Sequence, residues 1–122
     1  MGRIQDLEVY KASYQFSKMI MRTKLNMPKS FKNDVGQLAL MAALQITRSI
    51  VIANGVRDKE KFIYRAVLEI DVIWQLLRMM YEFQVISAGE FKAISEKLYD
   101  LSEQLKKWLN WARKQSKNNT ES

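Results

Sequence analysis

The side chains that usually perform acid–base, thiol or metal chemistry are scarce in this chain. Its 122 residues include no cysteine and no histidine, so a thiolate nucleophile, a disulfide and the commonest metal ligand are all missing. Glu96, Asp100 and Glu103 share a helix face by their spacing, but the Glu-x-x-His pattern of a carboxylate di-metal site does not occur. The sequence therefore predicts a protein with no catalytic residues, no bound metal and no cofactor.

Lysine and arginine form the clearest chemical pattern. They number 20 against 13 acidic residues, which gives a formal net charge of +7. Residues 11–32 include six basic side chains and no acidic one, and residues 106–117 include five more, again without an acid. Segregated positive charge favours a polyanionic partner, RNA or DNA, over a surface that only keeps the protein in solution, although the second interpretation stays open.

The candidate phosphate-binding residues fall into three groups along the chain. The first group shares the outer face of the first predicted helix and consists of Lys11, Lys18, Arg22 and Lys29. The second lies at the turn between the second and third helices and consists of Arg57, Lys59 and Lys61. The third lies near the end of the fourth helix and consists of Lys106, Lys107, Arg113 and Lys114. We expect these side chains to neutralise phosphates and release counterions, which provides affinity without reading base sequence.

Long helices must position these groups. Apolar residues recur at steps of three and four, which predicts helices over about residues 4–27, 31–54, 59–84 and 88–115. One proline and four glycines leave few breaks between the helices. Because the links are short, we expect an all-α fold, namely an antiparallel up-down-up-down four-helix bundle. This single domain covers residues 1–117 and is followed by a disordered polar tail over residues 118–122.

Particular residues mark the expected ends of the helices. Ser30 is expected to cap the second helix, and Asp58 the third. Asn54-Gly55 is typical of a helix end that is closed by a left-handed residue. Ser87 and Glu90 fit a capping box at the start of the fourth helix, where each side chain satisfies a backbone N–H of the other residue.

Three helices carry more apolar residues than one core stripe needs. On the second helix, the expected core stripe includes Leu38 and Ala39. The surplus residues on the first three helices are Leu7, Tyr14, Met21, Leu25, Leu40, Leu44, Val51, Val72, Leu76, Met79 and Phe83. Because large apolar patches usually mark interfaces, these residues are the predicted contact surface of a homo-oligomer, and the fourth helix is expected to be the most solvated.

Two tryptophans lie near the end of the fourth helix. Trp108 continues the core stripe, whereas Trp111 points away from it, between Lys107 and Lys114. An indole in that position can stack on a base or pack against a partner subunit. Packing is the interpretation that we favour, because one tryptophan does not make a stacking platform.

The apolar segments of the chain do not indicate a membrane protein. The first residues lack the apolar run of a secretion signal, so a cytoplasmic location is expected. The most apolar stretch, residues 35–56, contains Arg48, and a charge near the middle of a bilayer costs a few kcal/mol. This stretch is therefore predicted to be a buried helix of the bundle, and no membrane partner is expected.

Several short motifs resemble those of a known family. They are the entry Asp6-Leu7-Glu8-Val9-Tyr10-Lys11, the Met27-Pro28-Lys29 break and a second helix that ends in Ala53-Asn54-Gly55. In these motifs the chain resembles the four-helix-bundle proteins encoded in large-subunit rRNA intervening sequences. That group typically shows Ile-Ala-Glu-Gly, whereas this chain reads Ala53-Asn54-Gly55-Val56 and lacks the acid.

Other positions resemble more closely the accessory variability determinant of diversity-generating retroelements, a branch of the same superfamily. They are Ala53-Asn54, Asp58-Lys59, Ala66, Leu76-Leu77-Arg78-Met79, Ile86-Ser87 and Trp108, and the resemblance spans about residues 5–112. It implies a barrel-like, ring-shaped homopentamer that binds RNA and DNA through basic surfaces and associates with a reverse transcriptase. The alternative is an rRNA intervening-sequence protein, or a protein-binding adaptor whose basic surface binds no nucleic acid.

Overall fold

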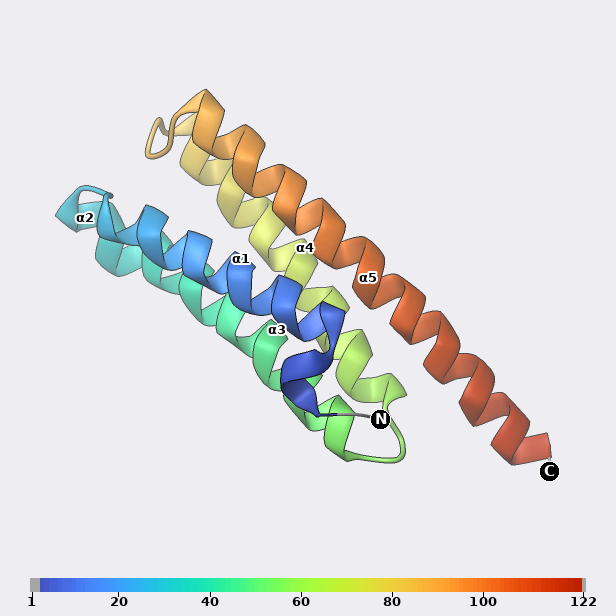
Figure 1. Cartoon of the computed structure of the whole chain (residues 1–122). Coiled ribbons are helices and arrows are strands. Elements are labelled where there is room, and N and C mark those ends of the chain that lie inside the picture. Colours follow the sequence, from blue (N-terminus) through green and yellow to red (C-terminus); the bar gives the residue numbers. More distant parts are fainter. Residues whose placement is uncertain (1–2, 122) are drawn as a thin grey trace.

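The computed structural model describes residues 3–121, with side chains up to residue 118, and contains no strand over that range (Figure 1). Its elements, in chain order, are the 3-10 turn η1 (Ile4–Asp6), helix α1 (Glu8–Leu25), the single turn α2 (Lys29–Phe31), the π turn η2 (Lys32–Gly36), and helices α3 (Gln37–Gly55), α4 (Glu60–Glu82) and α5 (Ala88–Glu121). The four long helices confirm the predicted all-α fold.

Each long helix packs against two others. Helix α3 contacts both α1 and α4, and helix α5 contacts both α4 and α1. In Figure 1, α2 and the α4–α5 turn lie at one end of the molecule, whereas the α3–α4 turn lies at the other end, beyond which α5 extends. We call the second end, made of residues 56–61 and the part of α5 from residue 106 onward, the α3–α4 pole.

The core is built from stripes that all four long helices contribute. The largest fully buried side chains are at most 2% exposed. They are Phe16, Ile20, Ile46, Ile50, Ile63, Ile70, Ile73, Leu77, Met80, Ile94, Leu98 and Leu101. Each such side chain contributes about 1.5–3 kcal/mol when it is fully buried. Since every helix supplies several of them, every helix is needed for the fold.

The inner face of α3 consists largely of small residues. Ala39, Ala42, Ala43 and Ala53 are all 6% exposed or less. Leu38, which was expected in the core stripe, is 56% exposed, so that prediction is wrong. Leu38 lies in the same regular helix as these alanines, about 100° around the helix axis from Ala39, which places it at the outer edge of the buried stripe.

The connection from α1 to α3 is very tight. Helix α2 begins at Lys29, directly after Pro28, and no side chain caps it, so Ser30 does not have the predicted capping role. A Cβ atom on Gly36 would lie only 2.9 Å from the sulfur atom of buried Met27. Glycine at this position therefore lets the start of α3 lie against the end of α1.

Two other helices begin differently from the prediction. Helix α1 begins at Glu8 rather than near residue 4, because η1 and an extended Leu7 precede it. Helix α4 follows Lys59, and no side chain caps its first turn, so Asp58 does not have the predicted capping role.

Lys59 closes α3 in place of the left-handed residue expected at Asn54-Gly55. The residue after the helix, Val56, is extended with φ −117°, and no glycine among the described residues has a positive φ. Instead, the Nζ of Lys59 donates hydrogen bonds to the carbonyl oxygens of Ala53 at 2.8 Å, Val56 at 2.6 Å and Asn54 at 3.5 Å. The last carbonyls of a helix lack partners within it, and an ammonium group satisfies them while complementing the negative end of the helix dipole.

The α4–α5 turn contains a left-handed residue that is not glycine. Gln84 has φ 61°. The N–H of Gln84 donates to the carbonyl of Tyr81 at 3.0 Å, and the N–H of Val85 donates to the carbonyl of Met80 at 2.8 Å. These two bonds make a Schellman motif, in which glycine is the favoured left-handed residue.

Helix α5 begins as predicted but ends later. The N–H of Glu90 donates to Oγ of Ser87 at 3.1 Å, and the N–H of Ser87 donates to Oε1 of Glu90 at 3.0 Å, which is the expected capping box. The helix then continues to Glu121, since its last turns contain no proline or glycine. In the tail predicted to be disordered over 118–122, Asn118 is helical, and the side chains that follow it lie outside the described residues.

We predict that Gln84→Gly stabilises the protein. A residue with a side chain is strained in the left-handed conformation, and glycine removes this strain. Glycine also loses more backbone entropy on folding, so the free energy of unfolding should rise by about 0.5–1 kcal/mol. Thermal unfolding monitored by circular dichroism measures this change, with Gln84→Ala as the control that keeps the strain. A midpoint for Gln84→Gly at or below that of the wild type would contradict the Schellman geometry.

We also predict that Lys59→Met destabilises the protein by about 1–2 kcal/mol, because methionine keeps the apolar stem but removes the hydrogen bonds to the end of α3. Urea unfolding measures the loss. Lys61→Met is the matched control, since Lys61 is exposed and makes no such bonds, and its effect should stay within about 0.5 kcal/mol. Equal effects of the two substitutions would show that Lys59 does not close α3.

Candidate nucleic-acid interface

Three basic residues form an exposed row on α1. Lys11, Lys18 and Arg22 all lie on its outer surface. The Nζ of Lys11 is 3.2 Å from Oε1 of Glu8, and the Nζ of Lys18 is 5.3 Å from the centre of the Tyr14 ring. Contacts of this exposed kind contribute little energy, so the ammonium groups remain accessible to a ligand.

Lys29 does not join this row, and its predicted place there is wrong. It lies in α2, beyond Pro28, at the end of the molecule opposite the α3–α4 pole. Proline interrupts the helix at this point, so the helical spacing of the earlier residues cannot be continued through it.

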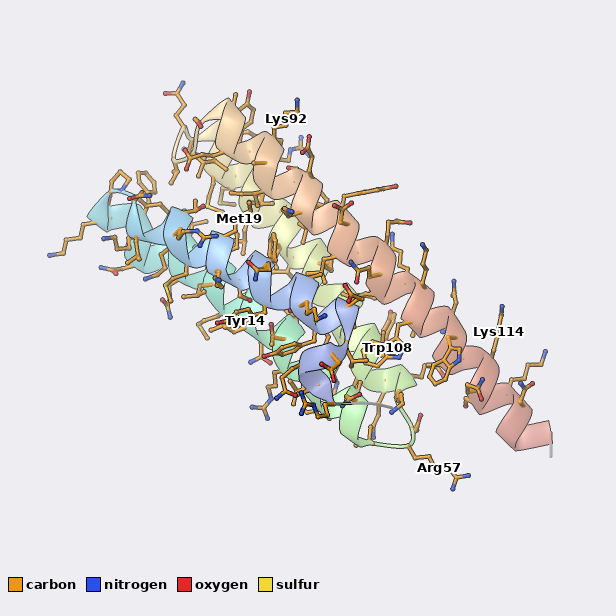
Figure 2. The ribbon with its side chains drawn as sticks, viewed as in Figure 1. Tyr14, Met19, Arg57, Lys92, Trp108 and Lys114 are labelled. Carbon is orange, nitrogen blue, oxygen red and sulfur yellow. The ribbon has the colours of Figure 1, made fainter. Side chains whose placement is uncertain are left out.

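The basic residues of the α3–α4 turn and of α5 come together at the α3–α4 pole. The Nε of Arg113 on α5 lies 3.0 Å from Oε1 of Glu60, the first residue of α4. This ion pair ties α5 to the start of α4, and the residues that follow Arg113 project past it. In Figure 2, the labelled Arg57 and Lys114 extend into solvent at this pole, whereas Lys92 lies at the opposite end of the molecule.

Two of the predicted phosphate-binding residues are used by the fold itself. Lys59 is bonded to the end of α3, and Arg113 is paired with Glu60. The predicted residues of the pole that are exposed and outside these contacts are Arg57, Lys61, Lys106, Lys107 and Lys114. Lys117, which the prediction did not include, is exposed on the same part of α5. Within the α3–α4 pole, the accessible positive charge is therefore centred on the last turns of α5.

Most residues of the predicted oligomer interface are exposed. They are Tyr14, Met21, Leu25, Leu44, Val51, Val72, Met79 and Phe83. Leu7 and Leu76 are half-buried against the core. Leu40 is only 7% exposed, so its predicted place at the surface is wrong. The hydroxyl of Thr47 on α3 is 2.6 Å from Oγ of Ser13 on α1, so Thr47 faces α1. Leu40 lies two turns before Thr47 and therefore faces α1 as well.

Further exposed apolar residues on α2, α3 and α4 were not predicted as part of this surface. They are Phe31, Leu38, Met41, Tyr64 and Leu68. An apolar pocket of about 210 Å³ lies at the end opposite the α3–α4 pole and is lined by Phe31, Val35, Met79, Met80, Phe83 and Val85. On the described part of α5, by contrast, only Tyr99 and Trp111 are large, apolar and exposed. The exposed apolar surface is thus concentrated on α1–α4.

The described residues also bear on a membrane-spanning segment and on a metal site. Residues 29–55 are long and apolar enough to cross a membrane, but 44% of their most apolar window is buried, and a core helix meets the same criterion. The described residues contain no group of three acidic, histidine or cysteine side chains that could hold a metal ion.

No protein-family model matches this sequence, and no curated protein matches it either. The functional proposal therefore depends on the distribution of charge and apolar surface over the helices, together with the resemblance in the sequence.

Proposed function

We propose that this protein is a non-catalytic homo-oligomer of up-down-up-down four-helix bundles that binds RNA or DNA through its basic residues. The observation that carries the proposal is the arrangement of exposed side chains, with most of the large apolar ones on α1–α4 and an acid-free run of basic ones on the last turns of α5. Residues 104–118 contain no acid, so the positive field along this part of α5 is not cancelled by its own sequence.

The large side chains on the outside of α3 support self-association. Leu38, Met41 and Leu44 are 56%, 51% and 50% exposed, while the inner face of the same helix is rich in alanine. Burial of apolar surface gains about 25 cal/mol per Å², and these side chains gain it only when another copy covers them. The resemblance to retroelement accessory proteins supports a ring-like pentamer as the form of the assembly.

Neutralisation of phosphates supplies the proposed binding energy. Each phosphate contact with a duplex steepens the dependence of log K on log salt by about 0.9, so affinity should fall sharply as salt rises. A ring repeats the α3–α4 pole in every subunit, and several weak patches then act together. All four long helices build the core, so none of them serves only to read a groove, and nucleic-acid shape is expected to decide the preference.

The same resemblance supports a reverse transcriptase as a protein partner. The competing function is that of a protein-binding adaptor whose basic residues only maintain solubility. The two functions differ in their response to salt, because an apolar protein contact changes little as salt rises whereas phosphate binding weakens steeply.

We predict that Met79→Glu dissociates the assembly. The substitution places a carboxylate within the exposed apolar surface of α4, where an interface would have to desolvate it. Light scattering should then give a lower mass, with helicity unchanged. Tyr99→Glu is the matched control, since Tyr99 is 59% exposed on α5, and its mass should equal that of the wild type. Equal masses for Met79→Glu and the wild type would place the interface elsewhere.

We predict that the triple variant Lys106→Glu, Lys107→Glu and Lys114→Glu weakens binding to a duplex RNA at least about tenfold and flattens its salt dependence. Fluorescence anisotropy over a salt series measures both quantities. Arg113 is left unchanged, because reversing its charge would place two carboxylates together at Glu60.

The control for net charge is the triple variant Lys29→Glu, Lys92→Glu and Lys97→Glu, in which three exposed lysines outside the α3–α4 pole are reversed. It should retain most of the affinity. If both triple variants lose binding equally, overall charge and not the pole is responsible. If neither loses binding, and reversal of Lys11, Lys18 and Arg22 has no effect, the adaptor function replaces the present proposal.

A further inference from the structure

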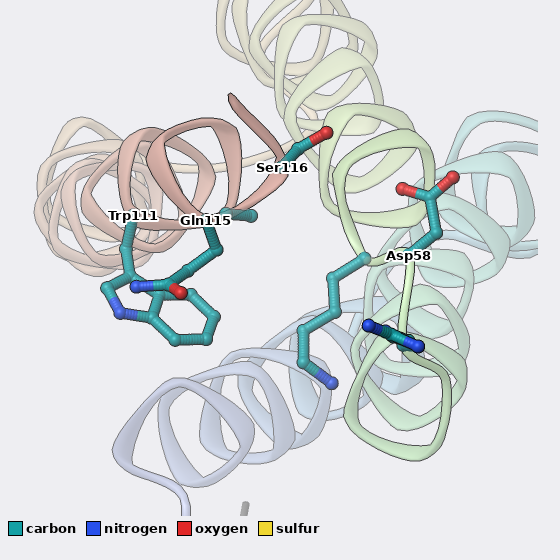
Figure 3. Close-up of a pocket in the computed structure, with 7 residues that line it drawn as sticks. Asp58, Trp111, Gln115 and Ser116 are labelled. Atoms are coloured by element: carbon teal, nitrogen blue, oxygen red, sulfur yellow. The ribbon is translucent and has the colours of Figure 1, made fainter. Parts of the chain in front are cut away.

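A pocket of about 300 Å³ opens at the α3–α4 pole, between α5 and the α3–α4 turn (Figure 3). It is lined by Arg57, Asp58, Lys59, Trp111, Ala112, Gln115 and Ser116. This volume lies at the lower end of the range of small-ligand sites, which is about 300–1,000 Å³. The pocket thus has room for a ligand about as large as a single nucleotide.

Trp111 supplies a flat apolar wall. Its side chain is 43% exposed, in a stretch of α5 whose other exposed residues are lysine, arginine, asparagine, glutamine and serine. Ala112, the next residue, is only 5% exposed and packs toward the core. Gln115 lies beside the indole in Figure 3, one turn further along the helix, so an amide group is available next to the ring. An aromatic face with a neighbouring amide suits a nucleobase, which stacks with its face and forms hydrogen bonds with its edge.

Positive charge lies on the other side of the pocket. The ammonium of Lys59 is held in place by its bonds to the carbonyls of Ala53, Asn54 and Val56, and it adds a fixed positive charge without a free donor. Arg57 is exposed and takes part in none of the ion pairs of the described residues, so its guanidinium can bind a phosphate with two parallel hydrogen bonds. The carboxylate of Asp58 lies away from Trp111 in Figure 3, where it leaves the indole side of the pocket uncharged.

We infer that this pocket holds one unpaired nucleotide of a bound strand, with its base stacked on Trp111 and its phosphate on Arg57. The inference rests on the proposed nucleic-acid binding and adds to it a preference for strands that contain unpaired nucleotides. A base that is paired within a duplex cannot turn its face to the indole. The pole would then hold a double-stranded segment by its phosphates and a single-stranded segment through this pocket as well.

The test compares two labelled probes on the full-length protein by fluorescence anisotropy. One is an oligothymidylate of about thirty nucleotides, and the other is a duplex of about fifteen base pairs, which carries about the same number of phosphates. Trp111→Leu should weaken binding of the single strand on the order of tenfold and leave the duplex unchanged. Trp111→Phe, which keeps an aromatic ring, should retain most of the affinity, and Tyr99→Leu removes an exposed aromatic residue of α5 outside the pocket and should have no effect.

Tryptophan fluorescence gives an independent readout. Trp108 is buried and Trp74 is half-buried, so quenching by oligothymidylate should come mainly from Trp111 and disappear in Trp111→Leu. If the wild type and Trp111→Leu bind the single strand equally, the inference that the pocket binds an unpaired nucleotide is wrong. Duplex binding would still support the proposed function in that case. Loss of affinity for both probes alike overturns the inference too, because Trp111 would then act on the fold or the assembly. Absence of binding to either probe by the wild type contradicts the proposed function itself.

Discussion

The small residues on the inner face of α3 constrain the rest of the molecule. Alanines occupy half of the eight buried positions of this helix, whereas large apolar side chains such as Leu38 and Met41 remain outside. The outer face of α3 also carries the exposed polar residues Gln45 and Arg48, but most of its large exposed side chains are apolar. In the proposed oligomer, a further subunit covers this face. The apolar residues on the outside of α1 and α4 widen the same surface.

Structural and accessible charges are mixed at the α3–α4 pole. Lys59 closes α3, and the pair of Arg113 with Glu60 holds α5 next to the start of α4. These contacts fix the backbone from which Arg57 and Lys114 project into solvent. A count of basic residues cannot distinguish the two classes, because the distinction depends on which carbonyl or carboxylate lies within hydrogen-bond distance. The accessible charge, five of the seven predicted residues at this pole, is what a polyanion would meet.

The stripes of α1, α4 and α5 and the capping box at Ser87 follow from local spacing, and the sequence was sufficient to predict them. The errors have two kinds of cause. Leu38 lies at the edge of the buried stripe of α3, where helical spacing alone does not decide burial. Breaks in the backbone at Leu7 and Pro28 shift the start of α1 and the place of Lys29. The contact of Lys59 with α3 had a signal, since a lysine four residues after Gly55 can reach the last carbonyls. The sequence also contained Trp111 and Arg57, but only the fold shows that one pocket joins them.

The mass of the wild-type protein in solution tests the central claim most directly. Sedimentation equilibrium at a concentration on the order of tens of micromolar, in both low and high salt, measures it without any substitution. The account predicts a single species whose mass is several times the 14.4 kDa of one chain, and which persists in high salt because apolar contacts hold it together. A species of 14.4 kDa at these concentrations would contradict it, since the outer faces of α1, α3 and α4 would then have no covering partner.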